Sequence, residues 1–151
     1  AARAAADELA QYGIGVELWS ATSYKALRDD ALSAERWNRL HPGQPAKVPL
    51  VAQLLADAPG PVVAVSDFMK IVPEQVARFL PGRTFVPLGT DGMGRSDTRD
   101  SLRGYFEVNT GHVVVAVLSA LAADGKASPD EVQAAIARHG IDPGSPDPLL
   151  V

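Results

Sequence analysis

The sequence predicts an α/β domain in which a mostly parallel sheet is flanked by helices. Three apolar, β-prone runs at residues 16–20, 61–65 and 84–88 alternate with stretches of helical periodicity. The run at 61–65 is continuously apolar, which is typical of a strand covered on both faces. A chain of 151 residues with 46% hydrophobic side chains can bury one core. We therefore expect residues 1–151 to form a single domain.

The first half of the chain predicts three helices. Residues 1–12 are rich in alanine and end at Gly13, a residue that readily terminates a helix in the left-handed conformation. Apolar residues at helical spacing then run over 23–40, and Pro42 prevents the helix from continuing. A shorter apolar stripe over residues 50–55 predicts the third helix.

The segment after the second strand predicts a helix over residues 68–79, because its apolar positions recur at helical spacing. After the third strand, a short helix that carries Leu102 is expected. Ser96 or Asp97 precedes it, and either side chain can cap its first turn.

The last third of the chain carries clear helix-start signals. Asn109 or Thr110 can cap an apolar helix over residues 112–123. The Ser-Pro-Asp-Glu motif at 128–131 combines a capping serine, a proline in the first turn and a glutamate placed for a capping box. The proline-rich tail, residues 141–151, is expected to be an extended surface segment or a contact arm.

Composition excludes several classes of function. The net charge is −4 and the arginines are scattered, which argues against a nucleic-acid-binding surface. No apolar run reaches the roughly 20 residues that a bilayer requires, so we expect no contact with a membrane. The chain has no cysteine, which excludes disulfides and cysteine-ligated zinc and suits a cytoplasmic protein.

The most polar loop of the chain is LGTDGMGRSD, residues 88–97, directly after the third predicted strand. Its glycine N–H groups could bind phosphate, and Asp91 with Asp97 could bind a divalent metal. However, the loop lacks the Gly-Lys-Ser/Thr of a P-loop and the spacing of a dinucleotide fingerprint. A tight connection that caps the next helix is favoured over a ligand site.

No residue pattern indicates catalysis. The three histidines form no ligand pair, and ordinary positions near helix ends suffice for them. No Gly-x-Ser-x-Gly elbow is present. Ser66 and Asp67 follow a predicted strand at the end where α/β proteins place ligands, but helix capping is the favoured role for them. We assign no catalytic, cofactor-binding or metal-binding residue.

Three strings carry a resemblance to a known family: ELWSATSYKALRDDALSAERWNRLHP, SDFMK and LGTDGMGRSDTRDSLRGYFEV. In this order and spacing they resemble the C-terminal domain of the homodimeric-type decarboxylating component of the pyruvate dehydrogenase complex, a transketolase-like family. The resemblance extends from about Gly15 to Ala137. Three positions depart from the family pattern: Met93 replaces an aromatic residue, Phe68 a tyrosine and Asn109 an aspartate.

The resemblance implies an enzyme that decarboxylates pyruvate on thiamine diphosphate with magnesium and passes the two-carbon unit to the lipoyl group of dihydrolipoyl acetyltransferase. In that family the cofactors are held by two preceding domains, and the C-terminal domain supports the homodimer. The resemblance thus places no catalytic or cofactor-binding residue in this chain. It implies a fragment that lacks the first strand of the domain and is inactive alone.

For the glycine-rich loop, we expect Asp91, Arg95, Ser96 and Asp97 to fix an interdomain or intersubunit contact. Two alternatives stay open. The chain could be a subunit of a split transketolase-like enzyme that transfers another two-carbon unit, for instance to a carrier protein. An independent phosphate-binding module is the third possibility.

Overall fold

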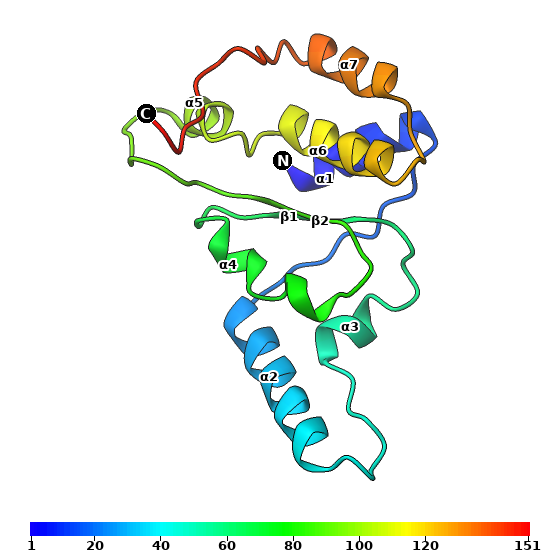
Figure 1. Cartoon of the computed structure of the whole chain (residues 1–151). Helices are drawn as coiled ribbons and strands as arrows, with labels where there is room; N and C mark the ends of the chain where they lie inside the picture. The colour runs from blue at the N-terminus through cyan, green and yellow to red at the C-terminus, as the bar shows by residue number, and fades with distance from the viewer.

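The computed structural model describes residues 1–151 and shows a small sheet between two groups of helices (Figure 1). The elements follow in the order α1 (Ala2–Leu9), η1 (Ala10–Tyr12), α2 (Tyr24–Leu40), α3 (Leu50–Leu54), β1 (Val62–Val65), α4 (Ile71–Glu74), η2 (Ala77–Phe79), β2 (Phe85–Leu88), α5 (Arg99–Tyr105), α6 (Thr110–Ala123) and α7 (Pro129–Arg138). Helices α1, α6 and α7 lie on one side of the sheet, and α2, α3 and α4 lie on the other.

The sheet consists of β1 and β2, which pair in parallel. Val62 lies opposite Phe85, and Val65 lies opposite Leu88. Val65 and Leu88 pack against the core of the α1/α6/α7 side, whereas Val62 and Phe85 pack against the core of the α2/α3 side. Apolar side chains are therefore at least partly buried on both faces, as the continuous apolar run predicted.

Residues 16–20 do not form the first of the three strands that the sequence predicts. The segment is irregular and joins no sheet, and Val16, Leu18 and Trp19 are 41%, 52% and 53% exposed. β-Branched and aromatic residues favour extended backbone, but a strand forms only beside a partner that accepts its hydrogen bonds. No such partner lies along this segment. The absence of a first family strand from this chain stays a prediction.

The prediction of one continuous helix over residues 68–79 is also wrong. It is replaced by the four-residue helix α4 and the 3₁₀ turn η2. Pro73 has no backbone N–H and lies within α4, so the hydrogen-bond ladder cannot run through it. The segment still contributes Val76 and Phe79 to the core beneath the sheet.

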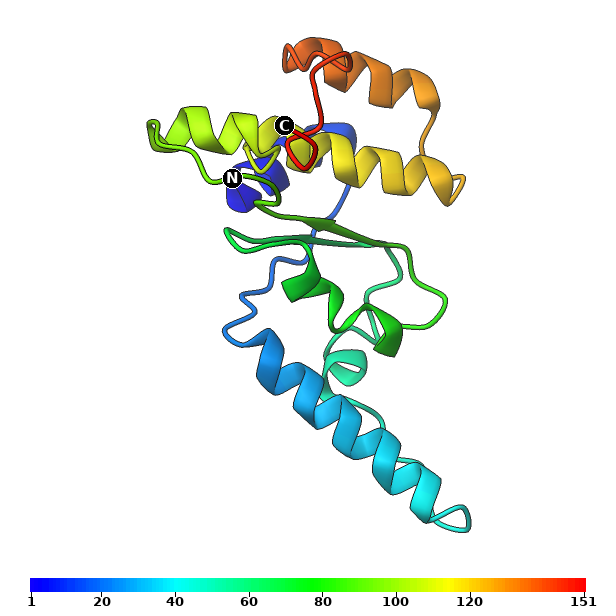
Figure 2. The ribbon, with the colours of Figure 1, turned by 60° about the vertical axis from the view of Figure 1, so that its left-hand side comes forward.

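Helix α6 forms the centre of the α1/α6/α7 side (Figure 2). Val114 and Leu118 are completely buried, and they pack with Ala5 and Leu9 of α1 and Ala135 of α7. The helix also contacts both strands. This side of the molecule therefore has a continuous core that joins the two ends of the chain.

Residues 99–123 together are long and apolar enough to cross a membrane, judged by length and composition alone. The structure divides this stretch into α5 and α6, and Glu107 between them has a positive φ of 58°. Because α6 packs between α1, α7 and the sheet, it is the core helix of the domain. Such helices commonly satisfy the same length and composition test.

Helix α2 and the loop after it project away from the rest of the molecule in both ribbon views (Figures 1 and 2). At the tip, the Asn38 side chain forms two hydrogen bonds with the backbone of Lys47, of 2.9 and 2.7 Å. The Trp37 and His41 rings stack with centroids 3.6 Å apart, and Lys47 Nζ lies 4.0 Å from the Trp37 ring. The tip thus has a fixed shape.

Two helix-end predictions are confirmed directly. Gly13 follows η1 with φ of 73°, the left-handed conformation expected of a terminating glycine. Ser128 Oγ accepts a hydrogen bond from Glu131 N, and Glu131 Oε2 accepts one from Ser128 N, which completes the capping box.

Candidate functional site

The carboxyl ends of β1 and β2 lie at the same edge of the sheet because the strands are parallel. The loops 66–70 and 89–98 both start there. Ser66 N donates to Leu88 O over 2.9 Å, which joins the two strand ends. The structure therefore brings together the two loops in which the sequence analysis weighed functional residues.

Hydrogen bonds through Thr90 fasten one loop to the other. Thr90 N donates to Phe68 O over 2.9 Å, and Thr90 Oγ1 donates to Asp67 O over 2.8 Å. The approach is so close that a Cβ on Gly89 would lie 2.5 Å from Phe68 O. Only glycine fits at this position without a shift of backbone.

Asp91 is the first of the four predicted site residues, and it connects the two loops. Its Oδ2 accepts a hydrogen bond from the backbone N of Lys70 over 3.1 Å. This partly buried contact spans 21 residues of sequence. Asp91 therefore supports the shape of the edge.

The sequence analysis favoured helix capping as the role of Ser66, and this prediction is wrong. Its Oγ accepts a hydrogen bond from Phe68 N over 3.0 Å, which closes a local turn. Helix α4 begins only at Ile71, too far along the chain for Ser66 to reach its first turn.

The C-terminal segment lies against the glycine-rich loop. Gly92 has φ of 100°, and a Cβ there would lie 2.0 Å from Pro148 O. Pro148 itself is buried, although its neighbours Leu149 and Leu150 are exposed. The tail is thus a contact arm, but local sequence patterns gave no sign that it would reach Gly92.

Arg95, Ser96 and Asp97 line one polar cavity of about 340 Å³, together with Ser101, Leu102 and Tyr105. The Arg95 guanidinium carbon lies 4.3 Å from the centre of the Tyr105 ring, a cation–π contact. Arg95 takes part in none of the chain's ion pairs. Three of the four predicted site residues therefore share a cavity. The sequence analysis did not identify Tyr105, whose ring supports Arg95.

Helix α5 is capped by Thr98, not by the predicted Ser96 or Asp97. Thr98 Oγ1 accepts a hydrogen bond from Ser101 N over 3.3 Å. Because the helix starts at Arg99, only residue 98 can reach the N–H groups of the first turn. Asp97 instead accepts a hydrogen bond from Thr98 N over 2.6 Å.

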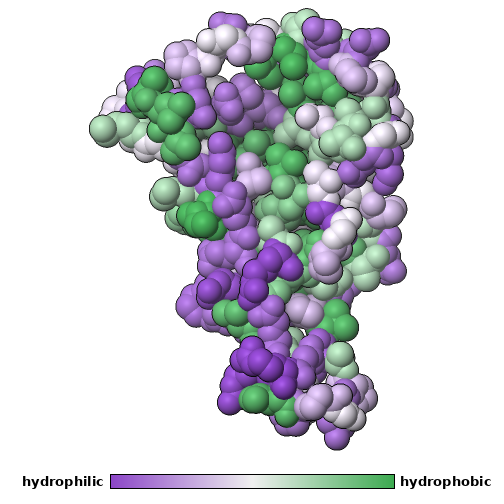
Figure 3. Space-filling model, in the orientation of Figure 1, coloured by the Kyte–Doolittle hydropathy of each residue, from purple (hydrophilic) through white to green (hydrophobic).

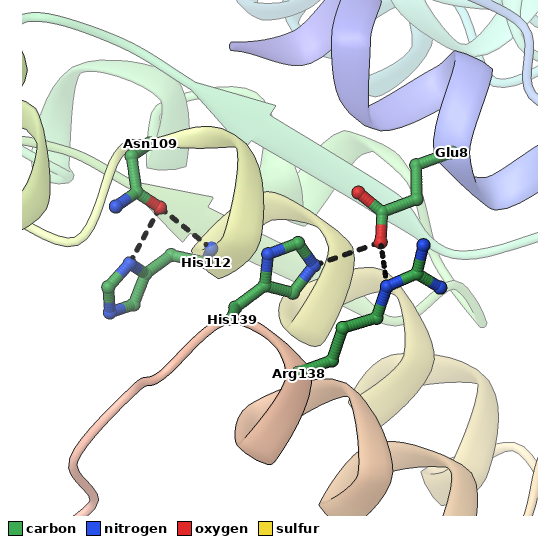
Figure 4. Close-up of polar contacts among 5 residues, drawn as sticks. All are labelled: Glu8, Asn109, His112, Arg138 and His139. Carbon is green, nitrogen blue, oxygen red and sulfur yellow. Dashed lines mark hydrogen bonds and ion pairs between the residues drawn. The ribbon is translucent and has the colours of Figure 1, made fainter.

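A second polar cluster joins α1 to α7 (Figure 4). His139 Nε2 lies 3.0 Å from Glu8 Oε1, and Arg138 Nε lies 3.7 Å from the same oxygen. Gly111 of α6 permits this arrangement, since a Cβ there would lie 2.7 Å from His139 Cγ. The cluster holds α1 against α7. Because Glu8 and His139 lie 131 residues apart in the sequence, no local pattern could predict this contact.

His112 lies in the first turn of α6, where the sequence analysis expected it. Its Nδ1 donates to Asn109 Oδ1 over 2.9 Å, because an amide oxygen can only accept (Figure 4). The same oxygen caps the helix by accepting from His112 N. Burial lowers the pKa of His112; the Glu107 carboxylate opposes this shift and His139 adds to it.

A cavity of about 310 Å³ also opens between α3 and η2, with mostly apolar walls. Its cation, Arg83, donates to the backbone oxygens of Leu55 and Gly60, so its charge holds the loop before β1. All three nitrogens of the Arg83 guanidinium thus donate to the backbone.

The donor set of the chain does not fit the magnesium ion that the resemblance implies for the whole enzyme. No three His, Asp or Glu side chains converge as metal ligands. At the glycine-rich loop, the Asp91 and Asp97 carboxylates are engaged by backbone N–H groups. We therefore derive no chemical step through a cofactor from these residues.

Comparison with known proteins decides the family. The family model described as the transketolase-like TK C-terminal domain matches residues 1–109, which include both strands and the glycine-rich loop. The chain belongs to this family. Membership confirms the expected fold class, and the small parallel sheet between helices is consistent with it.

Relatives of this transketolase-like domain carry one shared name. The chain is 49% identical to the pyruvate dehydrogenase E1 component of Pseudomonas aeruginosa over 91% of its length. It is 45% identical to the proteins of the same name from Escherichia coli K12, over 98% of the chain, and Mycobacterium tuberculosis H37Rv, over 94%. The aligned part is 16%, 17% and 15% of these relatives, so the chain spans about one sixth of their length.

Proposed function

We propose that this chain is the C-terminal domain of a cytoplasmic pyruvate dehydrogenase component that uses thiamine diphosphate and magnesium. The whole enzyme would decarboxylate pyruvate and acetylate the lipoyl group of dihydrolipoyl acetyltransferase. The observation that carries the proposal is identity of 41–49% over nearly the whole chain with relatives that share this name. Both the glycine-rich loop and the Asn109 cap lie within the matched family domain.

Within that enzyme, the domain's role would be to support the homodimer rather than to carry out chemistry. Support comes from the carboxyl edge of the sheet, where Phe68, Met69 and Ile71 are 69%, 54% and 58% exposed beside the glycine-rich loop. Exposed apolar groups gathered in this way mark surfaces that contact other polypeptide. The loops that carry them are held in place by Gly89 and Asp91.

Activity of the full-length enzyme tests the proposal. With thiamine diphosphate and magnesium, it should reduce an artificial electron acceptor in the presence of pyruvate and acetylate a lipoyl domain. The split transketolase-like alternative predicts turnover of a different two-carbon donor, such as hydroxypyruvate or a ketose phosphate. Preference for such a donor over pyruvate would contradict the proposal.

Calorimetry tests where the cofactor binds. Titration of the 151-residue chain with thiamine diphosphate and magnesium should give no binding heat, whereas the full-length enzyme should bind. Binding by the chain alone would make it an autonomous phosphate-binding module.

Subunit association tests the role of the loop. Replacing Arg95 and Asp97 by alanine in the full-length enzyme should weaken the dimer, as measured by sedimentation. Unchanged sedimentation together with unchanged activity would rule out a contact role for the loop.

A further inference from the structure

Arg95 has no acidic partner within the chain. The ion pairs of the chain use Lys25, Arg78, Arg138 and His139 as cations. Arg95 forms none of them, although it lies at the wall of a polar cavity. A guanidinium is the side chain best suited to bind a carboxylate through two parallel hydrogen bonds.

The Tyr105 ring holds the Arg95 guanidinium in position. The 4.3 Å cation–π contact occupies one face of the guanidinium and leaves the N–H groups at its edge free to donate. The hydroxyl oxygen of Tyr105 is buried and has no hydrogen-bond partner within the chain. Buried hydroxyls are normally paired, so this region is not completed by the chain's own groups.

The other walls of the cavity select the kind of anion. The Ser96 and Ser101 side chains place hydroxyl groups there, which can donate to an oxygen. Asp97 adds a negative charge to the same cavity. Because like charges repel, this carboxylate disfavours a doubly charged phosphate more strongly than a singly charged carboxylate.

The surroundings of the cavity indicate a protein partner rather than a small free acid. Met93 is 73% exposed, and the contact between Pro148 and Gly92 holds Leu149 and Leu150, 56% and 79% exposed, beside the same loop. Figure 3 shows hydrophobic atoms gathered at this edge, near the C-terminus marked in Figure 1. A charged anchor beside apolar groups is the arrangement of a protein interface, whereas a free acid would leave the apolar groups uncovered.

We propose that Arg95, positioned by the Tyr105 ring, is the receptor for an Asp or Glu side chain supplied by the remaining polypeptide of the same enzyme. The inference rests on the proposed function, since the relatives are about six times longer than the chain and supply that polypeptide. It adds the chemistry of the contact: one carboxylate in the cavity and apolar residues beside it.

Zero-length cross-linking in the full-length enzyme identifies the partner. With Arg95→Lys, a water-soluble carbodiimide should join the new amine to an Asp or Glu outside residues 1–151, and mass spectrometry of the digest locates the link. Arg99→Lys, at the exposed start of α5 and outside the cavity, is the matched control and should form no such link. Failure to form the link, or links only to Asp91, Asp97 or Asp100, would overturn the proposal.

Hydrogen exchange of residues 88–98 in the full-length enzyme measures the contact without cross-linking. Arg95→Gln should speed exchange of these amides by at least about tenfold, because it removes a charge-assisted hydrogen bond. Tyr105→Leu, which removes the platform, should speed exchange too. Tyr105→Phe keeps the ring and loses only the hydroxyl, so it should speed exchange less than Tyr105→Leu. Exchange unchanged by Arg95→Gln contradicts the receptor role. Slower exchange on addition of sodium acetate to wild type would show an open anion site, which also contradicts it.

The two proposals fail in different ways. A wild-type enzyme that does not turn over pyruvate would refute the proposed function, yet the cross-link would still test the receptor. Conversely, normal pyruvate turnover without a cross-link would refute the receptor alone.

Discussion

The α1/α6/α7 side and the rest of the molecule differ in how far they bury their apolar side chains within the chain. On the first, Leu9, Val114 and Leu118 are almost fully buried by contacts within the chain. None of the large exposed apolar side chains lies on α1, α6 or α7. They lie instead on residues 16–19, on residues 40–54 from the end of α2 through α3, on α4 and the loops at the carboxyl edge of the sheet, and on the C-terminal segment.

This difference separates what the chain stabilises by itself from what it offers to a partner. The α1/α6/α7 side also has polar contacts between its own helices and caps, through the Glu8–His139 contact and the Ser128 capping box. The carboxyl edge instead leaves Arg95 unpaired and Met93 exposed. A surface of this kind is suited to contact with further polypeptide.

The largest effect on stability is expected from a substitution in the core of the α1/α6/α7 side. Leu118→Ala removes a side chain with 0% exposure and should lower the free energy of unfolding by about 2–5 kcal/mol. Leu54→Ala, at a site 42% exposed on the opposite side, should cost less than about 1 kcal/mol. Urea unfolding of the chain measures both. Equal losses would remove the distinction between the two sides.

The next effect concerns the C-terminal segment at the carboxyl edge. Gly92→Ala places a Cβ against Pro148 O at a positive φ and should cost roughly 1–3 kcal/mol. Gly94→Ala is the matched control in the same loop, because nothing lies within 4 Å of its added Cβ. Limited proteolysis should show cleavage of residues 141–151 accelerated in Gly92→Ala only. Equal protection in both variants would mean that Gly92 does not hold the segment.

A smaller effect is expected at the start of α7. Ser128→Ala removes the cap and should cost about 1 kcal/mol in urea unfolding. Ser33→Ala, at an exposed position within α2, is the control and should be close to neutral. A loss no larger than that of the control would show that the capping box does not add to the stability of this side.

The lowered pKa of Glu131 makes the stabilisation by the capping box depend on pH. Hydrogen bonds from the Ser128 backbone, first, and from its side chain lower the pKa of Glu131 below 4.5. The folded-state pKa is then lower than the unfolded one, so the stabilisation is present above about pH 4.5 and is lost as pH falls through the folded pKa. The difference between wild type and Glu131→Gln should therefore shrink in acid.

The smallest effect is a pH dependence from His112. Because its folded-state pKa lies below 6.5, the unfolded chain binds more protons than the folded chain once pH falls below that value. The urea midpoint should therefore fall between about pH 7.5 and pH 5.5 more steeply in wild type than in His112→Gln. Parallel pH profiles would mean that burial does not control this histidine.

Local sequence signals predicted those features that neighbouring residues decide. Asn109 was one of two expected caps, and it accepts a hydrogen bond from His112 N as a cap must. The contact role of Arg95, Ser96 and Asp97 stays a prediction, although the three residues do share one cavity. The capping role of Thr98 was missed because the choice among three adjacent polar residues depends on where the helix axis begins, which is set by packing.

The sequence by itself determined the two paired strands, most helix ends and the polar loop, because these depend on interactions among residues within a few positions of each other. The tertiary structure decided that residues 16–20 have no strand partner, that Pro148 reaches Gly92 and that Tyr105 supports Arg95. Pairing and close approach depend on which surfaces meet once the chain has folded, and local periodicity carries no information about that encounter.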